Sequence, residues 1–209
     1  MKNNLFLKRF AAFLIDGLVV MFVSSALSYL TFLNPKYEEY RHYSDIQSEY
    51  YEKYYEGEIT ATELSREVQN LNYDLTKNGY VYVIGTIVIS ILYYTVFVYF
   101  TNGQTLGKKI MGIRIVSNKD KKLNILNYLI RTIVLNGIII NIVSLVAIGF
   151  NRNVFAKITS IASTIDLYYM MVLAMVVVFA SNGRGIQDIL AGTKVVDDRL
   201  KQEEGKDNN

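Results

Sequence analysis

The stretch Thr101-Asn-Gly-Gln-Thr-Leu-Gly-Lys-Lys-Ile-Met-Gly-Ile-Arg-Ile-Val116 decides the fold, because its pattern returns at residues 181–196. Both copies directly follow an apolar run of membrane-spanning length, residues 80–100 and 158–180. At an offset of 80 (182 − 102) the identical pairs are Asn102 and Asn182, Gly103 and Gly183, Gly112 and Gly192, and Val116 and Val196. The pattern predicts a two-helix unit used twice, with a glycine-punctuated tail on one membrane face. Chance agreement at glycine-rich positions is the alternative.

Four apolar runs dominate the chain, and 51% of its residues are hydrophobic. About 20 residues of helix cross a hydrocarbon core of about 30 Å, and each run reaches that length. Backbone groups in lipid must bond within their own segment, which favours helices. We therefore expect an all-α integral membrane protein with four transmembrane helices. They are expected at about residues 10–33, 80–100, 125–150 and 158–180.

Several kinds of chemistry are absent from this sequence. There is no cysteine, and the single histidine, His42, lies in a polar segment. Disulfides, thiolate metal sites and histidine-based catalytic sites are therefore excluded. No nucleophile elbow, phosphate-binding loop or dinucleotide fingerprint is present. We expect no cofactor, no metal, no enzymatic activity and no nucleic-acid partner.

Residues 34–79 form one long polar segment with ten acidic and five basic side chains. Thr60 and Glu63 fit a capping box, which predicts a helix from about Ala61 to Leu75. Gly57 is expected to separate that helix from an earlier tyrosine-rich one. The tyrosines are explained either by a membrane surface, where tyrosine is common, or by a binding role. We place this acidic loop outside the cytoplasm.

The connection after the second apolar run is basic. It includes Lys108, Lys109 and Arg114, which we expect to meet lipid headgroups or the cytoplasmic interface. Residues 112–117 and 193–196 alternate as short strands do, so the two tails are expected to meet in a very small sheet. The distribution of Lys and Arg places both termini in the cytoplasm. Residues 1–196 would be one transmembrane domain, and the charged tail 197–209 is expected to be disordered.

Ionisable side chains inside the spans carry the most information, because each costs about 2.5–3.5 kcal/mol at a helix centre. The three are Asp16, Arg131 and Asp166. Arg131, like Arg9 at the start of the first span, could extend to the interface as an anchor or serve a function. The short side chains of Asp16 and Asp166 cannot reach the interface in that way. They are the stronger candidates for function.

Three blocks resemble the RDD family of bacterial membrane proteins: Arg9-Phe-Ala-Ala-Phe-Leu-Ile-Asp16-Gly17, residues 102–116, and Gln187-Asp188-Ile-Leu-Ala-Gly-Thr193. That family is named for an arginine and two aspartates, here Arg9, Asp16 and Asp188. Gln187 replaces the usual histidine. The resemblance implies a multi-pass protein of the bacterial inner membrane. Some members are described as cation/proton antiporters.

Two functions follow as hypotheses. The first is a small secondary transporter, assembled as a homo-oligomer, with Asp16 and Asp166 as protonatable carriers. Arg9, Arg131 and Asp188 would form its cytoplasmic gate, and Arg9 could pair with Asp188. A structural role for the three family residues, holding the repeats together, is an equal alternative. The second hypothesis is an adaptor that binds another membrane protein through its acidic tyrosine-rich loop or its basic face.

Overall fold

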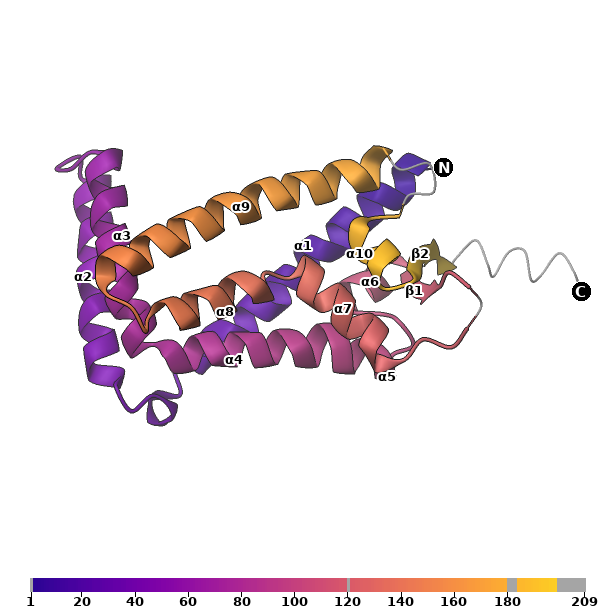
Figure 1. The fold of residues 1–209 in the computed structure, drawn as a ribbon, viewed down its shortest axis with the longest axis horizontal. Coiled ribbons are helices and arrows are strands. Elements are labelled where there is room, and N and C mark those ends of the chain that lie inside the picture. The colour runs from indigo at the N-terminus through magenta and orange to yellow at the C-terminus, as the bar shows by residue number, and fades with distance from the viewer. Residues whose placement is uncertain (1, 120, 180–183, 199–209) are drawn as a thin grey trace, which may run out of the picture. The chain divides into compact units, whose positions relative to one another are not determined.

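The computed structural model describes residues 2–119, 121–179 and 184–198 of the chain. The described residues are mostly helical, with one two-stranded sheet (Figure 1). They form two compact units. The first unit contains Met1–Val23, Val88–Ile138 and Leu167–Asn209, and the second contains Ser24–Ile87 and Ile139–Asp166.

In the part of the chain that the structure describes, two helical segments are long and apolar enough to cross a membrane, namely Leu5–Leu27 and Tyr80–Phe100. The first lies in α1 (Lys2–Leu27). The second joins α4 (Tyr80–Ile91), a π-helical segment η2 (Leu92–Phe97) and α5 (Val98–Phe100). A third crossing is counted only if α7 (Ile125–Leu135) and α8 (Ile138–Ala147) are one span, and these are bent by 66°. Among the described residues, the expected set of four crossings is therefore not confirmed.

Three of the four expected helix boundaries are wrong. α1 covers Lys2–Leu27 instead of 10–33, because the chain tightens where the Ser28 hydroxyl donates to the Ser25 carbonyl, before a 3-10 turn η1 (Thr31–Leu33). The third run, expected as one helix over 125–150, breaks at Gly137, whose φ of +63° is left-handed. The fourth begins at Arg152 instead of 158, since the Asn151 side chain caps α9 (Arg152–Phe179).

The second unit contains a helical hairpin of α2 (Tyr37–Tyr55) and α3 (Ala61–Asn78). The Thr60–Glu63 capping box is formed at the start of α3, as the sequence predicts. Gly57, with φ +78°, separates the two helices. Within the same unit, Arg152 pairs with Asp74 at 2.7 Å and lies over the Tyr73 ring. The acidic segment is therefore a folded hairpin fastened to the start of α9.

The first unit contains the predicted small sheet. Strands β1 (Ile113–Ser117) and β2 (Thr193–Asp197) pair antiparallel, with Ile115 opposite Val195. These two residues are also equivalent at the offset of 80, so the sheet has local two-fold symmetry. A short helix precedes each strand, α6 (Leu106–Met111) and α10 (Ile186–Leu190). The turns from helix to strand use Gly112 and Gly192, at φ +67° and +65°.

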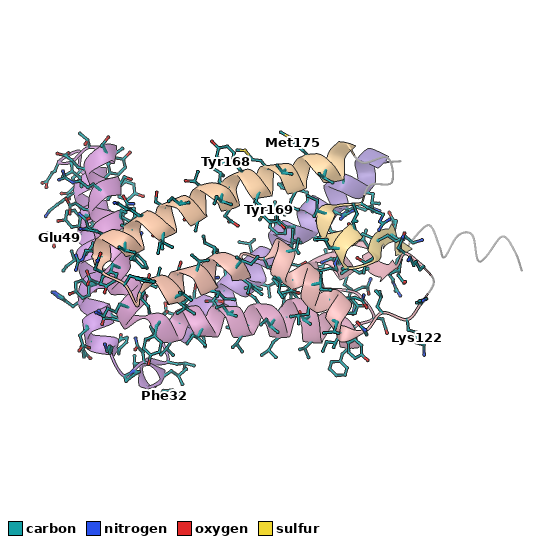
Figure 2. All side chains as sticks on the ribbon, in the orientation of Figure 1. Phe32, Glu49, Lys122, Tyr168, Tyr169 and Met175 are labelled. Atoms are coloured by element: carbon teal, nitrogen blue, oxygen red, sulfur yellow. The ribbon has the colours of Figure 1, made fainter. Side chains whose placement is uncertain are left out.

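The core of the first unit lies where the sheet meets the long helices. Ile113, Ile115 and Val195 pack with Ala12, Val98 and Tyr128. On α9, the mostly exposed Tyr168 and Met175 point away from α7 (Figure 2). The neighbouring Tyr169 donates to the Val134 carbonyl of α7 at 3.0 Å. The sheet thus holds α6 and α10 against α1, α5 and α7.

The expectation of a disordered tail from residue 197 is wrong for its first two residues. Asp197 ends β2 and pairs with Lys8, and Asp198 pairs with Arg114. The opposite charges of the tail acids and of Lys8 and Arg114 explain this order. Residues 199–209 lie outside the described part of the chain.

Candidate functional site

Asp188 lies at the centre of a buried ion-pair cluster in the first unit. Its carboxylate accepts hydrogen bonds from Arg9 Nη2 at 2.5 Å, from Arg131 Nη1, and from the Gly185 backbone N–H at 3.0 Å. Arg131 also donates to the Thr193 hydroxyl at 2.6 Å. The Asp188 side chain is fully buried. The cluster therefore joins α1, α7 and α10, which are far apart in the sequence.

The charges around Asp188 decide its protonation state. Burial alone raises the pKa of this carboxyl group, but Arg131 and Arg9 stabilise the anion, and the pKa falls to about 2. The carboxylate is thus ionised at physiological pH. The predicted pairing of Arg9 with Asp188 is confirmed. Arg131 is buried and joins the same cluster, instead of extending to an interface as an anchor.

Asp16 is the centre of a second cluster in the same unit and is 1% exposed. One carboxylate oxygen accepts from the Tyr93 hydroxyl and from the Gly107 N–H, both at 2.8 Å. The other accepts from the Thr105 hydroxyl at 2.5 Å. Lys108 Nζ lies 3.6 Å from that second oxygen. This cluster joins α1, η2 and α6.

Gly107 makes this contact geometrically feasible. A Cβ atom at this position would lie 2.4 Å from the Ala12 carbonyl oxygen and 2.8 Å from the Asp16 carboxylate. Only glycine therefore lets α6 approach α1 closely enough for its backbone to donate to Asp16. Gly107, in the 101–116 stretch, therefore has a packing role that its position in the sequence did not reveal.

Lys108 was expected to meet lipid headgroups or the cytoplasmic interface, but the structure gives its ammonium a partner within the protein. Its ammonium is turned inward to Asp16, and its side chain is 15% exposed. Burial lowers the pKa of Lys108 to about 8, although the Asp16 carboxylate acts in the opposite direction. Lys109 is exposed, so its role at the interface stays a prediction. Arg114 pairs with Asp198 at 2.5 Å.

One residue of each cluster is related to the other by the offset of 80, and the two carry opposite charges. Lys108 and Asp188 are equivalent positions (188 − 108) on α6 and α10. Lys108 pairs with an acid on the long helix α1, and Asp188 pairs with a base on α7. Each short helix is therefore joined to a longer helix by an ion pair. The short helix α6 supplies the base of its pair, whereas α10 supplies the acid of its pair. The sequence shows the opposite charges at these two positions but not the partner of Lys108.

A cavity of about 340 Å³ borders both clusters. All of its lining residues belong to the first unit. Its charged lining side chains are Arg9, Asp16, Lys108 and Arg131, and most of its walls are apolar. A largely apolar cavity with a few convergent polar groups is the usual form of a small-molecule site.

Asp166, the other predicted carrier, does not line this cavity. It is half-buried on the part of α9 that belongs to the second unit. In the described part of the chain, no hydrogen bond or ion pair involves its carboxylate. Of the five predicted transport residues, the structure thus brings together Arg9, Arg131 and Asp188, and places Asp16 on the same cavity.

Comparisons with known proteins agree with the resemblance found in the sequence. The sequence model of the RDD family matches residues 5–192. No curated protein and no solved structure matches the chain. The match covers nearly the whole chain and includes Arg9, Asp16 and Asp188. Together with apolar helices of spanning length, it identifies a membrane protein, and the chain belongs to the RDD family.

Proposed function

We propose that this protein is a small secondary transporter that exchanges a cation for a proton at the Asp16–Lys108 pair. One observation carries the proposal: a buried carboxylate and a largely buried amine share one site at the edge of a cavity. Ionisable groups inside a membrane protein are costly and are retained mainly where they have a function.

The protonation of Lys108 would couple the two fluxes. With a pKa of about 8, Lys108 is mostly charged at neutral pH and neutralises Asp16. A cation that binds beside Asp16 repels the ammonium, which favours release of its proton to water. When Lys108 binds a proton again, its charge displaces the cation. One cation would therefore be exchanged for one proton.

Flux measurements in proteoliposomes test this mechanism. We expect an external cation to drive protons out of the vesicles, as reported by a trapped pH-sensitive dye. In Asp16→Asn the rate should fall at least about tenfold, because a neutral amide attracts neither the cation nor Lys108. Asp45→Asn, the same change on the exposed face of α2, should keep the wild-type rate. Both variants must be monodisperse. Equal rates in wild type and Asp16→Asn would contradict the proposal.

The role of Asp166 as a second carrier stays a prediction. The same assay with Asp166→Asn tests it, since a carrier is needed for flux wherever it lies. Arg9, Arg131 and Asp188 could form the cytoplasmic gate, as the sequence suggested, or serve only to hold α10 in place.

We further propose four crossings in the bacterial inner membrane, as two two-helix repeats with cytoplasmic termini, in a homo-oligomer. The excess of Lys and Arg near the termini and in residues 101–124 supports this orientation. Because the chain has no cysteine, single cysteines report location cleanly. In intact cells, a membrane-impermeant maleimide should label Glu49→Cys and not Lys122→Cys (both residues are labelled in Figure 2). The reverse pattern would overturn the orientation.

The adaptor function remains the second candidate, and the folded hairpin favours it. Tyr51, Tyr54 and Tyr55 are exposed on α2, with Tyr55 at 82%. Exposed aromatic side chains are common at binding surfaces. An adaptor acting through the hairpin should lose function in Tyr54→Ser/Tyr55→Ser, whereas a transporter should keep its flux.

A further inference from the structure

The walls of the cavity contain aromatic side chains in addition to the Asp16–Lys108 ion pair. Phe6, Phe10 and Phe13 of α1 and Tyr94 of η2 line it together with Asp16. Calcium and magnesium ions need about six or more oxygen ligands, and this lining supplies few oxygen atoms. Aromatic faces instead attract organic cations, whose charge is spread over an apolar surface.

Gln187 supplies an independent indication. This side chain lines the cavity and is 4% exposed. Its amide oxygen is buried and has no hydrogen-bond donor in the described part of the chain. A Cβ at Gly185 would lie 2.5 Å from the Gln187 amide, so glycine there leaves room for that side chain. A buried acceptor that lines a cavity suits a ligand that donates a hydrogen bond.

We propose that the cavity binds an organic ammonium ion, whose N–H groups donate to Asp16 and to the Gln187 amide oxygen, and whose apolar body packs on the phenylalanine rings. This inference rests on the proposed exchange function and names its substrate class.

Lys108 gives this substrate class a physical basis. Its side chain is itself an alkylammonium held beside Asp16. A ligand ammonium would therefore replace a group of the same chemistry. The charged groups that act on Lys108 are Asp16 and Arg9 of α1 and Arg131 of α7. Its ammonium also donates to the Thr105 hydroxyl at 3.3 Å.

The charges around this cavity allow a cation to bind only if another positive charge is removed. Arg9 and Arg131 also line the cavity, so an added cation meets positive potential unless another charge leaves. Lys108 can lose its positive charge by releasing its proton to water as the ligand ammonium binds. The neutral amine then remains beside the ligand. Re-protonation of Lys108 reverses the step, and charge is balanced in both directions.

Calorimetry on the full chain in detergent tests the inference. Phenethylammonium chloride is titrated at pH 7 in buffers of different ionisation enthalpy, which report the protons released. We expect close to one proton released per ligand bound. Asp16→Asn should abolish binding, and Gln187→Met should weaken it about tenfold at unchanged fold. The uncharged 2-phenylethanol, of the same shape, should bind at least about tenfold more weakly.

Three outcomes would overturn the inference. Proton release by lithium, sodium or potassium chloride, without phenethylammonium binding, would leave the exchange function standing and remove the organic substrate. Equal binding of 2-phenylethanol would show an apolar cavity without cation recognition. No proton release with any cation, together with no flux in proteoliposomes, would overturn both the inference and the proposed function.

Discussion

Loss of about 3–5 kcal/mol of unfolding free energy is the expected result of Asp188→Asn. The substitution leaves Arg9 and Arg131 beside a neutral amide in a buried place. Because these two arginines join α10 to α1 and α7, the contact of α10 with both helices should weaken. Thermal unfolding in detergent, followed by gel filtration, measures the effect. Asp45→Asn, on an exposed helix face, is the matched control and should unfold at the wild-type temperature.

A second variant separates the ion pair from a general packing defect. If the charge is what matters, Arg131→Met should cost less in the Asp188→Asn background than in the wild type. Equal costs in both backgrounds would contradict the account. So would an Asp188→Asn protein as stable as the control.

The pH dependence of stability has a defined sign at Asp188. Its pKa is about 2 in the fold, below the ordinary value of 3.8. The unfolded chain therefore takes up a proton first as pH falls. The stabilisation of the fold by the ionised Asp188 carboxylate is complete above about pH 4 and is lost as the pH falls toward 2. In Asp188→Asn that part of the acid sensitivity should be missing.

An effect of similar size is expected for Gly107→Ala. The added methyl group would lie 2.4 Å from the Ala12 carbonyl oxygen, a backbone atom that cannot rotate away. α6 would have to move from α1, and the Gly107 N–H would lose Asp16 as its acceptor. Overpacking costs about 1–3 kcal/mol, and the lost hydrogen bond to a charged group adds about 1.5–3 kcal/mol.

Gly17→Ala is a matched control for Gly107→Ala. A Cβ at Gly17 meets nothing within 4 Å, although Gly17 follows Asp16 in the same helix. Alanine also favours a helix by about 0.5–1 kcal/mol over glycine. Gly17→Ala should therefore be at least as stable as the wild type in thermal unfolding. A Gly107→Ala protein that matches it would show that α6 does not contact α1 closely.

Part of this fold could be predicted because the same pattern of glycines occurs twice in the sequence. Gly112 and Gly192 mark the ends of two short helices, and alternating residues after them mark two strands. The equivalence at 80 then predicted that the strands meet. The pairing of Arg9 with Asp188 followed from the family resemblance, which places both residues in named motifs.

Other parts could not be predicted because they depend on contacts between distant segments. Lys108 lies in a basic stretch, and composition alone favours a surface role for it. Its inward position follows from Gly107, whose missing side chain lets α6 approach Asp16. One signal was available: Lys108 is equivalent to Asp188 at the offset of 80. Because Asp188 was expected to pair with a base on a long helix, an acid on a long helix would be the matching partner for Lys108. Asn136-Gly137 likewise marked the break between α7 and α8.

The central claim is that Lys108 and Asp16 form one buried site whose proton is released near neutral pH. An NMR titration of the Lys108 side chain in the full protein, in lipid nanodiscs, tests this claim most directly. We predict a pKa of about 8, because burial disfavours the ammonium. In Asp16→Asn the pKa should fall further, since the carboxylate no longer stabilises that charge. A Lys108 pKa near the ordinary 10.5, unchanged by Asp16→Asn, would contradict the account.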